Sequence, residues 1–235
     1  MFGFDMTYML LVMMPSMVLS GLASMMVKRT FAKYETVQTS RRITGADAAR
    51  IMLERKGVTN CTIEPISGRL SDHYDPRSRT LRLSEPVYNA TSLSAVGVAC
   101  HEAGHALQHA QGYKWLKMRS NLVPVMGLTS KASMPVIMVG FMLLQLAPVL
   151  GQWVLILGCV LFAAAVLFSV VTLPVEWDAS ARAKTAMVEA GIVSQDEVTG
   201  AGRVLNAAFL TYLAAAIASI MTLLYYLHRA GLLRR

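Results

Sequence analysis

The chain has 235 residues, of which 54% are hydrophobic and only 15% are charged. This composition excludes an ordinary soluble domain and is typical of an integral membrane protein. Lys and Arg residues that border membrane segments explain the formal net charge of +8. No aromatic-basic platform or groove-reading motif accompanies this charge, so we do not expect nucleic-acid binding.

Four segments have the apolar character of candidate membrane spans, for which about 20 residues are needed. They cover residues 4–27, about 132–147, about 152–173 and 205–227. The first lacks a basic region before it and a convincing cleavage site after it, so we expect an N-terminal anchor and not a signal peptide. The second is short and contains Pro135, so a re-entrant or buried hairpin arm is an open alternative. The uncharged run Pro148 to Gly151 would form the hairpin turn.

The distribution of Lys and Arg predicts the side of the membrane on which the polar segments lie. Residues 28–56 contain eight Lys or Arg, whereas the hairpin loop at 148–152 contains none. By the positive-inside rule, segments 28–131 and 174–204 face the cytoplasm. Four full spans would place the basic tail at 228–235 outside, which conflicts with the rule. Either the tail is an exception or one segment does not cross.

Residues 28–131 are numerous enough for a small domain. We expect an amphipathic helix from Thr39 or Ser40 to Gly57, then strands at 61–66 and 79–84, then a helix that contains residues 101–105. In this order the strand at 79–84 would lie close to the last helix. Two roles for that strand remain open: an exposed edge that binds an extended peptide, or a strand that only covers the core.

The five residues His-Glu-Ala-Gly-His at 101–105 are the most informative motif. A helix places His101 and His105 one turn apart on one face, with Glu102 beside them. Two imidazoles and a carboxylate that does not coordinate are what a hydrolytic zinc site needs, and Glu102 would be the general base. The motif also occurs by chance in ordinary amphipathic helices. The uncharged run from Ser92 to Cys100 favours a buried helix, where unpaired polar groups cost several kcal/mol and metal ligation removes that cost.

A third ligand must come from elsewhere in the chain. Glu176 is the best candidate, because it lies where a span is expected to end and a new helix to begin, on the same side as the histidines. An alternative role for Glu176 is that of an acid at a helix start, favoured by the helix dipole. Asp178 is the next candidate ligand, although on a helix it points about 200° away from Glu176.

Three further residues are candidates for a contact near the metal or with the reacting carbonyl. His109 is about 12 Å along the helix from His101, so it cannot join the same ligand set and is expected at a cavity mouth or behind the ligands. His73, beside Tyr74 in an expected turn, could donate a hydrogen bond to an oxyanion. A turn histidine without a chemical role is the open alternative.

Four runs of the sequence together resemble the YugP-like family of neutral zinc metallopeptidases. They are LSDHYDPR at 70–77, LSEPVY at 83–88, HEAGHALQH at 101–109 and LPVEWDAS at 173–180. That family looks distantly related to the HtpX-type and CAAX prenyl proteases. The resemblance implies zinc (Zn2+) on His101, His105 and Glu176, with Glu102 catalytic. The distant relatives usually carry Asp where Ser180 stands, so a carboxylate contact there is in doubt, and whether Asp178 replaces it stays open.

The sequence therefore predicts a mainly α integral membrane protein, with about four transmembrane helices and a small α+β zincin-like domain facing the cytoplasm. The expected parts are an anchor (1–27), the catalytic domain (28–131), a transmembrane hairpin (132–173), a cytoplasmic helix with the third ligand (174–204), and a last transmembrane helix with a basic tail (205–235). The polar residues Gln108, His109, Gln111 and Lys114 predict that the zinc helix emerges into water. Cys61, Cys100 and Cys159 are expected to be free thiols in a reducing compartment.

Two functions from different classes are consistent with these features. The first is a cell-membrane zinc endopeptidase that cuts membrane or membrane-proximal polypeptides. The second is a zinc-stabilised scaffold that binds other membrane proteins without cutting them. Glu102 favours the enzyme, because a purely structural site would sooner close its coordination with a fourth protein ligand. A homo-oligomer or a membrane partner is left open.

Overall fold

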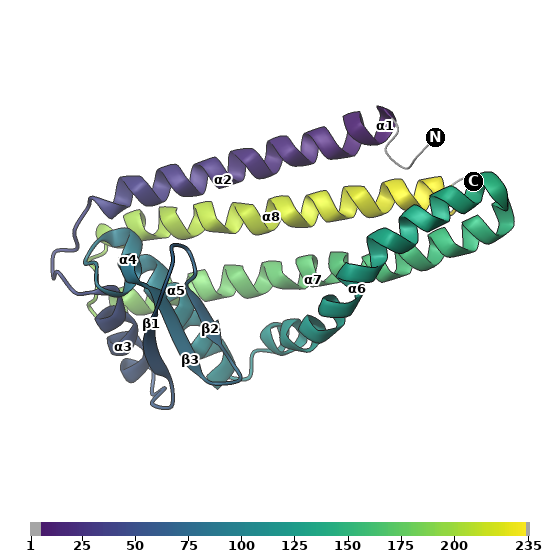
Figure 1. Cartoon of the computed structure of the whole chain (residues 1–235). Coiled ribbons are helices and arrows are strands. Elements are labelled where there is room, and N and C mark those ends of the chain that lie inside the picture. The colour runs from purple at the N-terminus through teal and green to yellow at the C-terminus, as the bar shows by residue number, and fades with distance from the viewer. Residues whose placement is uncertain (1–5, 234–235) are drawn as a thin grey trace. The chain divides into compact units, whose positions relative to one another are not determined.

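The computed structural model describes residues 6–233, which are mainly helical (Figure 1). The elements are α1 (Met6–Tyr8), the π-helical turn η1 (Met9–Met13), α2 (Met14–Glu35), α3 (Gly45–Arg55), β1 (Thr62–Ile66), β2 (His73–Asp75), β3 (Thr80–Ser84), α4 (Glu85–Tyr88), α5 (Leu93–Ala110), α6 (Lys114–Leu146), α7 (Pro148–Glu189) and α8 (Glu197–Arg229). Contacts divide these residues into two compact units. The first contains 6–22, 118–173 and 211–233, and the second contains 23–117 and 174–210. Each unit has its own hydrophobic core.

Four helices of the described part are long and apolar enough to cross a membrane, by length and composition. They are Met6–Glu35, Lys114–Leu146, Pro148–Glu189 and Glu197–Arg229. The four predicted apolar segments fall within these helices, apart from Ala147, which lies between α6 and α7, and Phe4 and Asp5, which lie outside the described residues. Every helix extends beyond its apolar segment; α7, for example, begins at Pro148 and continues to Glu189. Pro135 lies inside α6 and does not end it.

Glycines bring α6 and α7 close together in the first unit. A Cβ atom added to Gly158 would lie 2.6 Å from Cγ1 of Ile137, and one added to Gly140 would lie 2.7 Å from the backbone nitrogen of Leu155. Small residues permit such close helix packing. The predicted turn at 148–151 is wrong: these residues form the first turn of α7, and only Ala147 separates the two helices. Proline is well suited to the first position of a helix.

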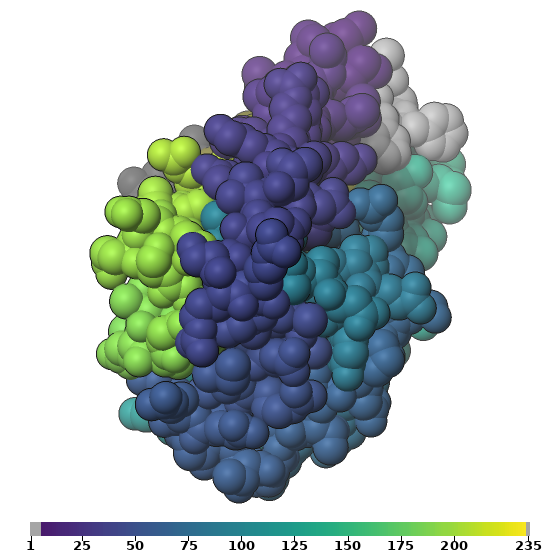
Figure 2. All heavy atoms as spheres, turned by 90° about the vertical axis from the view of Figure 1, so that its left-hand side faces the viewer, coloured from purple at the N-terminus to yellow at the C-terminus, as the bar shows by residue number. Residues whose placement is uncertain are grey.

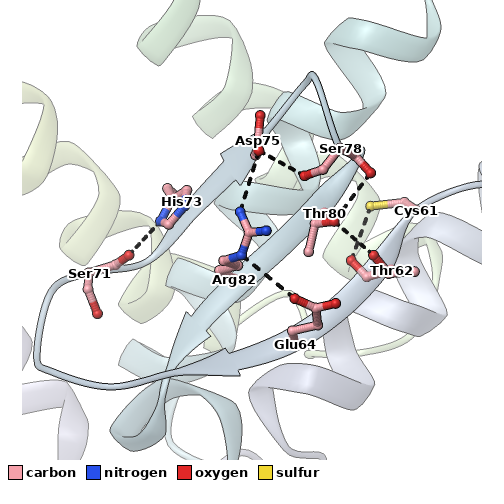
Figure 3. Close-up of polar contacts among 9 residues, drawn as sticks. All are labelled: Cys61, Thr62, Glu64, Ser71, His73, Asp75, Ser78, Thr80 and Arg82. Carbon is pink, nitrogen blue, oxygen red and sulfur yellow. Dashed lines mark hydrogen bonds and ion pairs between the residues drawn. The ribbon is translucent and has the colours of Figure 1, made fainter.

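A three-stranded sheet in the order β1-β3-β2 forms one layer of the second unit. The central strand β3 is parallel to β1, with Thr80 opposite Thr62, and antiparallel to β2, with Leu81 opposite Tyr74. On the outer strands, Glu64 and Asp75 lie 3.7 and 3.5 Å from the guanidinium of Arg82 on β3 (Figure 3). The leucines of β3 point the other way, into the core that β3 shares with α3 and α5.

The sheet corrects one expectation and decides an open alternative. The run His73–Asp75 was expected in a turn, but it forms the edge strand β2. Of the two roles left open for 79–84, the exposed edge is excluded, because β3 has a hydrogen-bonded neighbour on each side. Its residues Leu81 and Leu83 are fully buried, so this strand covers the core, the second of the two roles considered. A three-residue strand carries too little periodicity to be found in a sequence.

Helix α3 begins later than expected. The hydroxyl of Thr44 accepts a hydrogen bond from the backbone nitrogen of Asp47, which caps the helix before Gly45. The preceding residues pair elsewhere instead: the backbone nitrogen of Thr39 donates to the carbonyl of Thr91, and the hydroxyl of Ser40 donates to Glu197 at the start of α8. These contacts attach the segment before α3 to the segment before α5 and to the start of α8.

Candidate metal centre

The helix that carries the His-Glu-Ala-Gly-His motif is buried for most of its length. The hydroxyl of Ser92 caps α5 by accepting a hydrogen bond from the backbone nitrogen of Ala95. The small and apolar side chains that follow pack in the core of the second unit. As the spacing predicts, the rings of His101 and His105 lie together, with centroids 4.8 Å apart.

Gly104, between the two histidines, lets α5 approach α7 closely. A Cβ atom added to Gly104 would lie 2.6 Å from the carbonyl oxygen of Ala179 on α7. This approach brings Glu176, whose side chain is 2% exposed, to the histidines. The expected break before Glu176 is wrong: α7 continues through Pro174 to Glu189. Proline removes one helical hydrogen bond, which a neighbouring helix can compensate.

The three side chains converge on a position of the right size for a metal ion. Oε2 of Glu176 lies 3.2 Å from Nε2 of His101 and 3.6 Å from Nε2 of His105. One ligand atom from each residue lies within 4.8 Å of the others, so the group could hold a metal ion. Tetrahedral zinc with bonds of about 2.0–2.2 Å separates its ligand atoms by about 3.3–3.6 Å. The donor set and the two Glu176 separations fit zinc.

Both histidines have a polar partner at the ring nitrogen that faces away from Glu176. Nδ1 of His101 lies 3.1 Å from Oγ of Ser180, and Nδ1 of His105 lies 3.0 Å from Oε1 of Gln108. Such partners fix the ring orientation and the tautomer, which leaves Nε2 to coordinate. Ser180 therefore contacts a candidate ligand directly, at the position where the distant relatives usually carry Asp.

Gln108 is an exception to the expectation that α5 emerges into water after the motif, which the exposed Gln111 and Lys114 bear out. Its side chain is fully buried, with 0% exposure. Its amide nitrogen donates to the carbonyl of Val175 and to the carboxylate of Asp178, at 2.8 Å in each case. Asp178 also accepts a hydrogen bond from Arg182. Asp178 therefore supports Gln108, and it lies outside the group of described residues that could hold a metal.

Glu102, Tyr74 and His109, which were also predicted near the site, are not among the three candidate ligands. Glu102 follows His101 on α5 and is partly exposed. The hydroxyl of Tyr74 lies 2.8 Å from Nδ1 of His109, and both line a polar pocket of about 300 Å³ together with Arg79. None of the three candidate ligands lines this pocket, so a place for His109 at the mouth of the metal site or behind the ligands stays a prediction. Burial raises the pKa of Tyr74 to about 12, so the hydroxyl is neutral at pH 7.

His73 is exposed on β2, and its Nδ1 lies 2.7 Å from the carbonyl oxygen of Ser71 (Figure 3). It is not part of the described group that could hold a metal. Sequence reasoning missed the contacts of Gln108, Ser180 and Gly104 with the site. The spacing of three between His105 and Gln108 was a usable signal, since such residues face each other on a helix.

Two helical histidines and a buried glutamate form the ligand set of a hydrolytic zinc site. The chain belongs to the family described as "Putative neutral zinc metallopeptidase", whose sequence model matches residues 8–231. It is also 45% identical over 208 residues to the "Putative membrane protease YugP" of Bacillus subtilis (strain 168), covering 88% of this chain and 90% of that protein. No solved structure matches the chain.

Proposed function

We propose that this protein is a membrane-embedded zinc endopeptidase that hydrolyses peptide bonds in membrane or membrane-proximal polypeptides. The observation that carries the proposal is the convergence of His101, His105 and Glu176 on one position, with Glu102 beside the first histidine. Membership of a zinc metallopeptidase family and the likeness to a protein named a membrane protease support it.

The residues have separate roles in the proposed reaction. His101, His105 and Glu176 would hold zinc, which supplies Lewis-acid activation of water and of the peptide carbonyl when bound. Glu102 accepts the proton of the attacking water and returns it to the departing amine. Ser180 and Gln108 hold the two imidazoles in the orientation that presents Nε2.

The proposal places the catalytic residues on the cytoplasmic side of a multi-pass membrane protein. Four long apolar helices support the membrane location. The eight Lys and Arg residues between positions 28 and 56 support the orientation. A polypeptide that meets the site must then lie in the cytoplasm or at the cytoplasmic surface of the bilayer.

Metal analysis of the purified chain, paired with cleavage of an unfolded protein, tests the proposal. Glu102→Gln should keep zinc and the fold but lower turnover by at least ~10², because the amide cannot accept a proton. Glu54→Gln, an exposed change of the same type on α3, is the matched control and should behave like wild type. Cleavage by Glu102→Gln at the wild-type rate would exclude this mechanism. Stoichiometric zinc without cleavage by the wild type would favour the non-proteolytic scaffold.

A further inference from the structure

A second hollow in the same unit lies between α2, α7 and α8, on residues that the proposed catalysis does not use. Its volume is about 550 Å³, and we call it the interfacial pocket. It is lined by Met26, Lys33 and Tyr34 of α2, by Trp177 of α7, and by Arg203 and Leu210 of α8, among others. Figure 2 shows the end of α2, in dark purple, beside the beginning of α8, in yellow-green.

The pocket is polar at one end and apolar at the other. The guanidinium of Arg203 donates to the hydroxyl of Tyr34 at 3.1 Å. This contact places Arg203 of α8 beside the last turn of α2. Lys33 precedes Tyr34 and belongs to the same end. Met26 lies seven residues before Lys33, and Leu210 lies seven residues after Arg203, so each is about 10 Å further along its helix. Met26 lies within the predicted span 4–27 and Leu210 within the predicted span 205–227.

The charge at the polar end is not neutralised within the pocket. The lining residues include Lys33 and Arg203 and no carboxylate. Three acids of these helices have partners outside the pocket: Glu35 pairs with Arg69 at 3.5 Å, Glu189 with Lys56 at 2.6 Å, and Glu197 with Ser40. Two cations without a facing acid complement an anion, and guanidinium groups are well suited to phosphate.

An aromatic pair adds the chemistry of a membrane interface. Trp177 is 58% exposed, and its ring packs against Phe209 with centroids 5.2 Å apart. The ammonium of Lys184 lies 5.8 Å from the centre of the same indole. Exposed tryptophan beside Lys and Arg is typical of the level of the lipid headgroups.

From this arrangement we propose that the interfacial pocket binds an anionic glycerophospholipid, with the phosphate at Lys33 and Arg203 and an acyl chain along Met26 and Leu210. The apolar end argues for a lipid over free phosphate, which would use only the cations. The inference rests on the membrane location proposed above, but it is independent of the proteolytic activity.

Fluorescence quenching of Trp177 by brominated lipids tests this site in the full chain. Trp115→Phe and Trp153→Phe leave Trp177 as the one remaining tryptophan, since the chain has three. In phosphatidylcholine nanodiscs, brominated phosphatidylglycerol should occupy the site with about a fivefold preference over brominated phosphatidylcholine. Lys33→Gln combined with Arg203→Gln should abolish the preference. Lys33→Gln alone should reduce it, and because Lys33 is exposed this change should not disturb the fold.

The control is Lys28→Gln combined with Arg29→Gln, which removes two positive charges, as the double variant does, but from residues of α2 that lie outside the pocket. It should keep the preference. Equal quenching by the two lipids, or an equal loss in the control, would overturn the proposal. Inorganic phosphate, added at constant ionic strength, should not remove the preference for phosphatidylglycerol. If phosphate does remove this preference, the site binds free phosphate and not a lipid.

A separate quenching measurement tests the membrane location alone. A variant that keeps only Trp153, which is exposed on α7, should be quenched by both lipids. Unquenched Trp153 would refute the membrane location and the lipid site together, whereas quenched Trp153 without a preference at Trp177 would refute the lipid site alone. The Glu102→Gln variant should retain the preference, so loss of the protease proposal would leave the lipid site standing.

Discussion

Nδ1 of His105 lies 3.0 Å from Oε1 of Gln108, one helical turn away on α5. The amide nitrogen of Gln108 is bound to the carbonyl of Val175 and to Asp178, so the amide cannot turn over without losing both contacts. The oxygen must then face His105, and the imidazole must donate from Nδ1. The lone pair of Nε2 is thereby directed towards Glu176.

We therefore expect Gln108→Met to weaken zinc binding by about 10–100-fold, the usual effect of removing a partner behind a ligand. The change keeps the volume of the side chain but removes its acceptor. Competition with a chromophoric chelator measures the affinity, and circular dichroism of the metal-free protein checks the fold. Gln195→Met, an exposed position, is the control. Unchanged zinc affinity in a folded Gln108→Met protein would contradict this role.

The contact between Gly104 and Ala179 predicts an effect of a single methyl group. Gly104→Ala places a Cβ atom 2.6 Å from the carbonyl of Ala179, so α5 and α7 must move apart. We expect a loss of about 1–3 kcal/mol in the free energy of unfolding and a fall in zinc content. Gly127→Ala, where an added Cβ meets nothing within 4 Å, should cost neither stability nor zinc. Full zinc occupancy in Gly104→Ala would show that the helices tolerate the methyl group.

Ligand substitutions should separate the three metal residues from their neighbours. His101→Ala, His105→Ala and Glu176→Ala should each lower zinc occupancy, measured by elemental analysis after dialysis. His109→Ala should not, because its Nδ1 faces Tyr74. Asp178→Asn should have a smaller effect than Glu176→Ala, since it acts through Gln108. Stoichiometric zinc in Glu176→Ala would require a different third ligand.

The proposed orientation can be measured with introduced cysteines. Ser67 is exposed in the loop between β1 and β2, so Ser67→Cys in a Cys61→Ser background is accessible to a thiol reagent. With a cytoplasmic domain, a membrane-impermeant reagent should label it only after lysis. Labelling in intact cells would reverse the orientation. Leu233→Cys, tested in the same way, decides between an outward basic tail and an α6 that does not cross.

The four apolar helices and the pairing of His101 with His105 could be predicted, because both depend on patterns within short stretches of sequence. The sequence did not predict the edge strand at His73–Asp75, since three residues held in place by β3 have no pattern of their own. The continuation of α7 through Pro174 was also missed, because helix packing overrides the local preference of proline. Gln108 was misjudged for a related reason. A polar residue was read as exposed, whereas its amide is buried between His105 on the same helix and Val175 and Asp178 on α7.

Glu176, the candidate third ligand, lies near the histidines, as its position along the chain predicts, but the contact of Ser180 with His101 could not be predicted from the sequence. Whether Ser180 could replace the carboxylate of distant relatives depends on one distance, 3.1 Å from Oγ to Nδ1 of His101. Such a distance arises from the approach of two helices that are far apart in sequence. This distance cannot be predicted from the composition of either helix alone.

The position of Cys100 has a consequence for the chemical durability of the site. This thiol directly precedes His101 in the chain, yet it is fully buried in the core of the second unit, and burial raises its pKa. A protonated thiol shielded from solvent is a poor nucleophile and a poor metal ligand. The converging donors are nitrogen and oxygen only. Peroxide and soft, thiol-seeking ions such as mercury should therefore spare this centre, and inactivation by such agents would have to begin elsewhere.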